Sequence, residues 1–82
     1  MSEYKYQHGL SIMRAQPFHI GHQKLVDRML KECERVTIVL GSIQEQGTAR
    51  NPLNYTTRKK MIQNIYRSRP EYERLKIIGL FD

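Results

Sequence analysis

Apolar side chains recur along the chain in two kinds of pattern. Short apolar runs at residues 9–15, 36–40 and 75–81 have the length and composition of β-strands, and the central run, V-T-I-V-L, is almost wholly apolar. Between these runs, apolar positions repeat at the spacing of an amphipathic helix, first over residues 22–33 and again from residue 56 or 57 onward. The pattern therefore predicts the order strand, helix, strand, helix, strand.

Each predicted helix has one apolar face. On the inward face we expect Leu25, Val26, Met29, Leu30 and Cys33 in the first helix, and Met61, Ile62, Ile65 and Tyr66 in the second. The polar face of the first helix carries Lys24, Asp27, Arg28, Lys31 and Glu32. Either Thr56 or Thr57 can cap the second helix, and Pro70 closes the connection that follows it.

Alternating strands and helices are typical of a parallel sheet. Right-handed connections place the three strands side by side with the first at one edge, which is half of a doubly wound, Rossmann-like α/β fold. Residues 1–8 form a polar lead-in, and residues 42–54 form a long polar loop of a kind that is usually functional. Ligands of such sheets bind beyond the carboxyl ends of the strands, so we expect the site there.

The junction between the first strand and the first helix carries the strongest candidate site. The stretch from Arg14 to His22 reads R-A-Q-P-F-H-I-G-H, in which Pro17 fixes the backbone and Gly21 removes side-chain bulk. A strand that turns tightly into a helix aims backbone N–H groups and the helix N-terminus at one point, which attracts phosphate. With His19 and His22 at the helix start, the stretch predicts a cradle for a nucleoside triphosphate.

The histidine pair has two other interpretations. Histidines three residues apart often lie on a solvated helix start or in a satisfied buried position. A metal site requires further ligands, and Cys33 lies about 16 Å from His22 at the helical rise, so it cannot supply one. The strand before the pair and the turn around it favour the phosphate interpretation, in which the imidazoles donate to phosphate oxygens.

Basic side chains gather at the start of the second predicted helix. Arg58, Lys59 and Lys60 place positive charge in its first turn, where cations oppose the helix macrodipole. This cluster is either solvated surface or a site where an anion offsets that cost, in which case Arg58→Glu stabilises the helix start and removes anion affinity. Arg50, in the preceding loop, is a candidate contact for a second phosphate. Other polar side chains of this loop that suit a base or ribose are Ser42, Gln44, Thr48 and Asn51.

Charge and composition narrow the class of partner. The net charge is +6, and eight of the fourteen basic residues lie between Arg50 and Lys76, which indicates an anionic partner. Few aromatic residues accompany them and no RNA- or DNA-binding motif is present, so a nucleic-acid partner is not expected. Cys33 is the one cysteine, which fits a reducing cytoplasm, and no apolar run is long enough to predict a membrane span.

These motifs resemble a known family. The H-x-G-H pattern is that of the nucleotidyltransferase superfamily, and the longer R-x-Q-P-F-H-x-G-H resembles the nicotinamide mononucleotide adenylyltransferases of the archaeal type and their bacterial relatives, some of which are fused to a Nudix hydrolase domain. A second block is similar to the same family at Gly41, Ser42, Gln44, Thr48, Arg50, Asn51, Pro52 and Arg58. Two blocks at the family's spacing make the resemblance specific.

The resemblance implies adenylyl transfer. The phosphate of nicotinamide mononucleotide attacks the α-phosphorus of ATP, giving NAD and pyrophosphate, with Mg²⁺ on the ATP phosphates and no covalent intermediate. It implies that the catalytic residues are His19 and His22, that ATP contacts Arg14, Gln16, Phe18 and Gly21, and that the mononucleotide contacts Ser42, Gln44, Arg50, Asn51 and Arg58. No side chain is expected to ligate the metal, and a homo-oligomer is expected.

The chain departs from the family's pattern in three respects. Met13 replaces a usual glycine and Ala15 a larger apolar residue, so we expect the two to compensate, with Met13 beside the ligand path. The family's C-terminal half, with an I-S-S-T-x-x-R-type motif, is missing, so residues 9–82 correspond to the N-terminal part of a nucleotidyltransferase domain, and the 82-residue chain is expected to have little or no activity alone. The alternatives are another nucleotidyltransferase of the superfamily, cytidylyl- or adenylyl-, and a non-catalytic nucleotide- or nucleic-acid-binding module.

Overall fold

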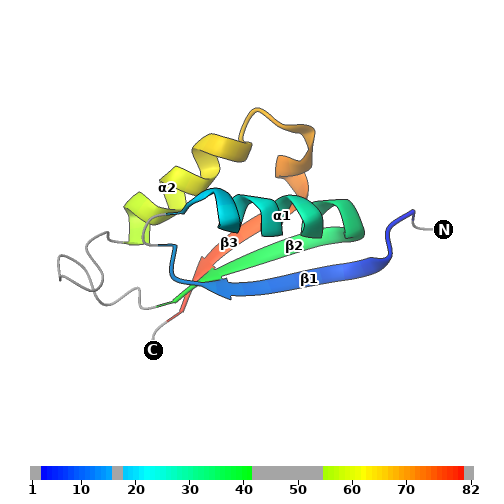
Figure 1. Cartoon of the computed structure of the whole chain (residues 1–82), viewed down its shortest axis with the longest axis horizontal. Coiled ribbons are helices and arrows are strands. Elements are labelled where there is room, and N and C mark those ends of the chain that lie inside the picture. Colours follow the sequence, from blue (N-terminus) through cyan, green and yellow to red (C-terminus); the bar gives the residue numbers. More distant parts are fainter. Residues whose placement is uncertain (1–2, 16–17, 42–54, 81–82) are drawn as a thin grey trace.

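Three parallel strands and two α-helices, with a short 3₁₀ helix, make up the described part of the chain (Figure 1). The computed structural model describes residues 3–15, 18–41 and 55–80. In chain order the elements are β1 (Tyr6–Met13), α1 (Ile20–Glu32), β2 (Cys33–Leu40), α2 (Tyr55–Tyr66), η1 (Pro70–Arg74) and β3 (Leu75–Gly79). The predicted alternation of strands and helices is confirmed.

The sheet has the strand order β1-β2-β3, with β1 at one edge as the sequence predicts. β2 pairs in parallel with both neighbours: Gly9 lies opposite Val36, and Ile38 lies opposite Ile77. Both connections step across the sheet in the same direction, and right-handed crossovers that do so place their helices on one face. Figure 1 shows α1 and α2 on the same side of the sheet.

The core lies between the two helices and β2. Val36, Ile38 and Leu40, at alternate positions of β2, are fully buried, as the apolar run V-T-I-V-L predicts. They belong to one cluster with helix side chains, chiefly Val26 and Leu30 of α1 and Ile62 and Tyr66 of α2. Burying one such aliphatic side chain contributes about 1.5–3 kcal/mol. The carboxyl end of β2 is therefore held firmly in place by the core.

The opposite face of the sheet is apolar as well, but open. Leu10 and Ile12 of β1 are 64% and 65% exposed. Ile12 is in register with Val39 of β2, which is in turn in register with Ile78 of β3, so apolar side chains cross all three strands. No helix of residues 3–15, 18–41 or 55–80 covers them. We refer to this surface as the open face.

Strand boundaries differ from those predicted because backbone pairing continues beyond the apolar runs. β1 begins at Tyr6, so residues 6–8, expected in the polar lead-in, pair with the start of β2, and β1 ends at Met13. β2 begins at Cys33, which the helical pattern had assigned to the first helix. β3 ends at Gly79 within the described residues. A ladder of backbone hydrogen bonds needs no apolar side chain, so periodicity misses these ends.

The helices also begin earlier than predicted. α1 begins at Ile20, and α2 begins at Tyr55, so Thr56 and Thr57 lie inside the first turn rather than at the cap. Leu25 was expected to point inward but is 45% exposed. Only Val26 and Leu30 of α1 are buried, because a helix lying flat on a sheet buries a narrow stripe.

Asp27, expected on the solvent face of α1, instead joins the two helices. Its Oδ1 accepts hydrogen bonds from the Tyr66 hydroxyl at 2.9 Å and from Arg69 Nη1 at 2.9 Å. Burial, reinforced by the bond to Asp27, raises the pKa of the Tyr66 phenol well above its usual range, so the hydroxyl stays a donor. The pairing of α1 with the end of α2 thus has a polar component that the sequence pattern does not reveal.

Gly9 leaves no room for a side chain beside Met29 of α1 and Cys33 of β2, and we expect Gly9→Ala to destabilise the fold by about 1–3 kcal/mol. A Cβ at this position would lie 2.7 Å from Cys33 Sγ and 3.1 Å from Met29 Cε. Urea unfolding followed by circular dichroism measures the loss. Adding Cys33→Ala removes the nearer sulfur, so the double variant should lose less than the sum of the two single losses; additive losses would contradict the steric explanation.

Candidate functional site

The turn after β1 is fixed by buried side chains on both sides. Ala15 has a φ of 51°, in the left-handed region that non-glycine residues seldom adopt, and this residue redirects the chain from the strand toward α1. Met13, Ala15 and Phe18 are all buried in the core cluster. Met13 therefore packs in the core rather than lying beside a ligand path as expected, and it shares that cluster with Ala15. Gln16 lies outside the described residues.

The two histidines form the cap of α1. His19 is the N-cap residue, and its Nδ1 accepts a hydrogen bond from the backbone N–H of Gly21 at 3.0 Å. His22 reaches back so that its Nδ1 accepts from the backbone N–H of His19 at 3.1 Å. This reciprocal pattern is a capping box built from histidines. Because each Nδ1 is an acceptor, the ring hydrogen of each imidazole lies on Nε2, which can donate outward.

The imidazole rings of His19 and His22 stack on one another. The centroids of His19 and His22 are 3.9 Å apart at an interplanar angle of 29°, and Phe18 stacks on the other side of His22 at 5.4 Å. A Cβ on Gly21 would lie 2.9 Å from Cε1 of His19, so glycine makes room for this ring. Phe18 and Gly21, both predicted to contact ATP, thus hold the imidazoles in place.

The environment keeps His22 in its neutral form. Burial lowers the pKa of His22 below its ordinary value, and the neighbouring His19 lowers it further. A neutral imidazole bonded through Nδ1 retains one hydrogen for a ligand. The pair therefore presents two ring donors beside the positive end of the α1 dipole, an arrangement that suits phosphate oxygens.

The lowered pKa of His22 predicts that the fold loses stability in mild acid. The unfolded chain takes up a proton at His22 more readily than the folded chain, so stability falls as the pH drops through about 6.5 toward the lower pKa of the folded state. Above that window His22 has no effect on the pH dependence. Melting temperatures of the wild type and of His22→Gln, compared between pH 7.5 and 5, isolate the effect; parallel curves would contradict it.

Arg58 lies elsewhere than predicted. It was expected as an exposed cation in the first turn of α2, but its side chain is fully buried. Its Nη1 donates to the carbonyl of Arg14 at 2.9 Å and to the carbonyl of Gly41 at 2.7 Å. Arg58 therefore closes the rim where β1 and β2 end rather than presenting a free charge to the mononucleotide. Two strand-end carbonyls offer it the acceptors that its burial requires.

The remaining predicted contacts with the mononucleotide fall outside the described residues. These are Ser42, Gln44, Arg50 and Asn51, together with Thr48 of the same loop. The residue that precedes this loop, Gly41, lies directly beside the turn, since its N–H donates to the carbonyl of Met13 at 3.0 Å. Arg14, which follows Met13, has an exposed side chain at the same edge. The structure thus brings Arg14 and the start of the loop together.

Sequence reasoning missed the capping role of the histidines and the burial of Arg58. The first had a signal, because His19 and His22 have the N-cap to N3 spacing of a capping box. The burial of Arg58 had no such signal, because its acceptors are the backbone carbonyls of Gly41 and Arg14, which lie 17 and 44 positions away in the sequence.

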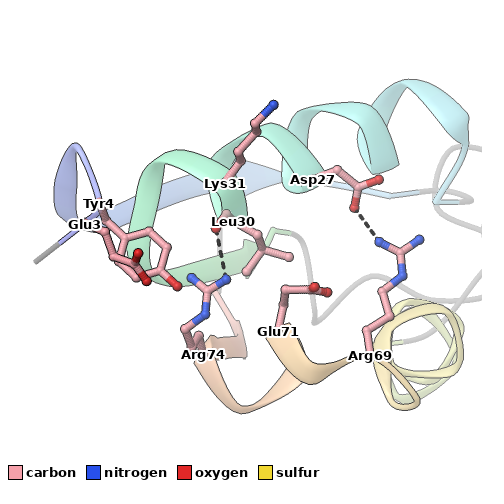
Figure 2. A pocket seen from close by; sticks show the side chains of 8 residues that line it. All are labelled: Glu3, Tyr4, Asp27, Leu30, Lys31, Arg69, Glu71 and Arg74. Carbon is pink, nitrogen blue, oxygen red and sulfur yellow. Dashed lines mark hydrogen bonds and ion pairs between the residues drawn. The ribbon is translucent and has the colours of Figure 1, made fainter.

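A pocket of about 580 Å³ lies apart from the predicted site, between α1, η1 and the N-terminal segment (Figure 2). It is lined by Glu3, Tyr4, Asp27, Leu30, Lys31, Arg69, Glu71 and Arg74, none of which is a predicted site residue. Arg74 fills one side, where its guanidinium donates to the carbonyls of Leu30, Cys33 and Glu34 and lies over the Tyr4 ring. This pocket is shaped by a structural arginine and does not mark the phosphate site.

The described residues show neither a cluster of metal-binding side chains nor a helix suited to a membrane. No three histidine, cysteine, aspartate or glutamate side chains come together there as a possible metal site. Nor does any helix among them have the length and apolar character needed to cross a membrane.

Comparison with known proteins places this turn in a family. The profile of the family described as "Cytidylyltransferase-like" matches residues 14–81, which begins at the first residue of the predicted cradle and covers most of the chain. The chain belongs to the cytidylyltransferase-like family. The matched residues include the histidine cap, both helices and the strands β2 and β3.

Relatives of this cytidylyltransferase-like chain confirm the narrower resemblance. It is 39% identical over 56 residues to the nicotinamide-nucleotide adenylyltransferase of Saccharolobus solfataricus, covering 68% of this chain and 33% of the relative. It is 32% identical over 79 residues to the nicotinamide/nicotinic acid mononucleotide adenylyltransferase of Acinetobacter baylyi, covering 96% of this chain and 42% of the relative. The chain thus spans well under half of the length of these two relatives.

A solved structure confirms the Rossmann-like fold. The bifunctional NMN adenylyltransferase/ADP ribose pyrophosphatase of Francisella tularensis, complexed with AMP and a manganese ion, superposes with a TM-score of 0.87 at 29% identity. The superposition covers 94% of this chain and 23% of that protein.

Proposed function

We propose that this chain forms the ATP-binding part of an enzyme that transfers an adenylyl group from ATP to nicotinamide mononucleotide, giving NAD and pyrophosphate. The observation that carries the proposal is the histidine cap, in which Nδ1 of each ring is held by a backbone N–H and Nε2 is left to donate. The relatives named as mononucleotide adenylyltransferases, at 32–39% identity, favour this substrate pair.

The reaction requires that the site stabilise negative charge, and it requires no proton transfer by a side chain. An oxygen of the mononucleotide phosphate forms a bond to the α-phosphorus of ATP, while the bond from that phosphorus to the bridging oxygen breaks and its electron pair leaves with pyrophosphate. Negative charge shifts onto the phosphate oxygens in the transition state, where the Nε2–H groups of His19 and His22 donate to them. Arg14, exposed at the same edge, is proposed to bind the triphosphate.

ATP is proposed to enter as its magnesium complex. The described groups around the histidine cap are imidazoles and an arginine, which suit the phosphate oxygens. The ion is proposed to be carried on the phosphates of ATP, where it would neutralise part of their charge. This chain's own contribution is proposed to be ring N–H donors and positive charge for the phosphate oxygens.

Three narrower features are proposed as well. Residues Ser42, Gln44, Arg50 and Asn51 are proposed to contact the mononucleotide, because their loop follows Gly41 at the rim. A cytoplasmic location is proposed because Cys33 is a free thiol.

Self-association of the 82-residue polypeptide is the third such feature, and it is expected from β1. This strand is at the sheet edge, contains neither lysine nor proline, and exposes Leu10 and Ile12 on the open face. Light scattering should therefore give a mass above that of the monomer. The variant Leu10→Lys/Ile12→Lys charges the edge and should shift the mass downward; a monomeric wild type would contradict the expectation.

The proposal is tested in two steps, because the relatives are longer than this chain. Titration of the 82-residue chain with magnesium ATP, followed by NMR of the His19 and His22 rings, should shift both sets of signals. A chimaera in which this chain replaces the matching 79 residues of the Acinetobacter baylyi enzyme should then form NAD from ATP and nicotinamide mononucleotide. Tight binding of CTP or of RNA in place of ATP would favour the cytidylyl or the nucleic-acid alternative and reject the proposal.

A further inference from the structure

The ends of β1 and β2 are joined by one side chain from α2. The last backbone bond between the strands runs from the N–H of Gly41 to the carbonyl of Met13, at 3.0 Å. One residue further on, the carbonyls of Arg14 and Gly41 are bridged by a single nitrogen, Nη1 of Arg58. The two hydrogens on this nitrogen diverge at a fixed angle in the plane of the guanidinium. Arg58 therefore sets the spacing of the two strand ends at the point where they separate.

This bridge acts on the peptide that directs the histidines. The carbonyl that Arg58 holds belongs to Arg14, and the next residue, Ala15, has the left-handed φ that turns the chain toward α1. His19 caps that helix four residues later. Freeing the Arg14 carbonyl would let this peptide rotate, and the helix start would move relative to the end of β2.

We propose that Arg58 is a positioning residue, which locks the ends of β1 and β2 so that the Nε2–H groups of His19 and His22 face the phosphates in one fixed arrangement. The proposal rests on the phosphate-binding role proposed for the histidine pair. It assigns Arg58 a role distinct from the direct contact with mononucleotide phosphate that its charge suggests. A positional error of about 1 Å at a reacting group can cost about 100-fold in rate, so such a bridge matters for function.

Arg74 provides a matched control within the same chain. Its guanidinium also donates to backbone carbonyls, with Nη1 at 2.7 Å from Cys33 O and 3.1 Å from Glu34 O, and Nη2 at 3.0 Å from Leu30 O. Figure 2 shows the Arg74 side chain reaching the end of α1. These carbonyls lie at the opposite end of β2 from Gly41. Loss of Arg74 therefore removes comparable structural bonds at a distance from the histidine cap.

The experiment compares Arg58→Lys with Arg74→Lys in the 82-residue chain labelled with ¹⁵N-histidine. Lysine keeps the charge but lacks the planar fork. We expect Arg58→Lys to shift the ring ¹⁵N signals of His19 and His22 and to weaken magnesium ATP affinity by about 10-fold or more, measured by calorimetry. Arg74→Lys should leave those signals in place and the affinity within about two-fold. All samples contain trimethylamine N-oxide, which favours the folded state, so that lower stability alone does not decide the result.

Equal effects of the two substitutions on the histidine signals would show a general structural role and overturn the proposal, as would the absence of any effect of Arg58→Lys. The outcome for adenylyl transfer is separate. If the wild type neither binds ATP nor supports NAD formation in the chimaera, adenylyl transfer is rejected, while a selective shift of the histidine signals in Arg58→Lys still supports the positioning role.

Discussion

Alanine at His19 or at His22 is expected to lower the rate of NAD formation by about 100-fold or more, because each substitution removes a ring N–H that is proposed to donate to charge developing in the transition state. The assay is pyrophosphate release by the chimaera with the Acinetobacter baylyi enzyme. Affinity for magnesium ATP, measured on the 82-residue chain, should fall less steeply than the rate, since part of each contact forms only in the transition state. Unchanged rates in both variants would reject the role of the pair.

Loss of the helix cap must be separated from loss of the phosphate donor, because both histidines serve the cap. At the N-cap, His19→Ser keeps a side-chain acceptor for the N–H of Gly21 without the imidazole. At the N3 position, His22→Glu keeps an acceptor for the N–H of His19 and adds a negative charge that favours the helix dipole. We expect both to be at least as stable as the alanine variants and as inactive. Recovery of activity along with stability would show that capping alone matters.

Arg58→Glu is expected to destabilise the fold by about 3–5 kcal/mol, the typical loss when one member of a buried charged arrangement is removed. The glutamate would face the carbonyls of Arg14 and Gly41, which now accept from Arg58, with no donor between them. Natural domains are stable by about 5–15 kcal/mol and small ones lie toward the lower end, so this loss would remove a large share of the free energy of unfolding. Urea unfolding followed by circular dichroism measures this loss. The expectation reverses the small stabilisation that follows from the sequence alone.

Lys60→Glu is the matched control for this prediction. Lys60 lies two residues further along α2 but is exposed, so the same charge change there affects no buried contact. A change in the free energy of unfolding of no more than about 0.5 kcal/mol is expected. If Arg58→Glu and Lys60→Glu changed the free energy of unfolding alike, the burial of Arg58 would not be the cause.

The sequence predicts the architecture well because hydrophobic spacing reports on it directly. The run V-T-I-V-L predicts a strand buried on both faces, and in β2 Thr37 and Val39 are buried on one face as Val36, Ile38 and Leu40 are on the other. The strand order also follows, since short right-handed connections leave few alternatives. The sequence also predicts that His19 and His22 lie at the start of the first helix, and they do form the cap of α1. Phosphate binding by Arg14 and the histidine pair stays a prediction.

The details that sequence reasoning misses depend on partners far along the chain. Asp27 looks like a solvated residue of α1, but Tyr66 at the end of α2 and Arg69 in the connection after it both donate to its carboxylate. Arg58 looks like one of three surface cations, but two strand-end carbonyls draw it inward. Neither partnership changes the local hydropathy pattern. Propensity and periodicity describe single elements, and these contacts exist only once the elements have packed.

The open face of the sheet links the activity of a longer polypeptide to its folding. A helix that covers the open face must belong to a right-handed crossover that runs across the sheet in the opposite direction, toward the free edge of β1 and away from β3. A parallel strand arriving by that route would pair with the free edge of β1, and its carboxyl end would stand beside Arg14, at the crevice where strand direction across the sheet reverses. The same segment would thus cover the open face and form the second wall of the crevice. In a polypeptide that has this crossover and this strand, heating should abolish catalysis and unfold the sheet in a single cooperative step.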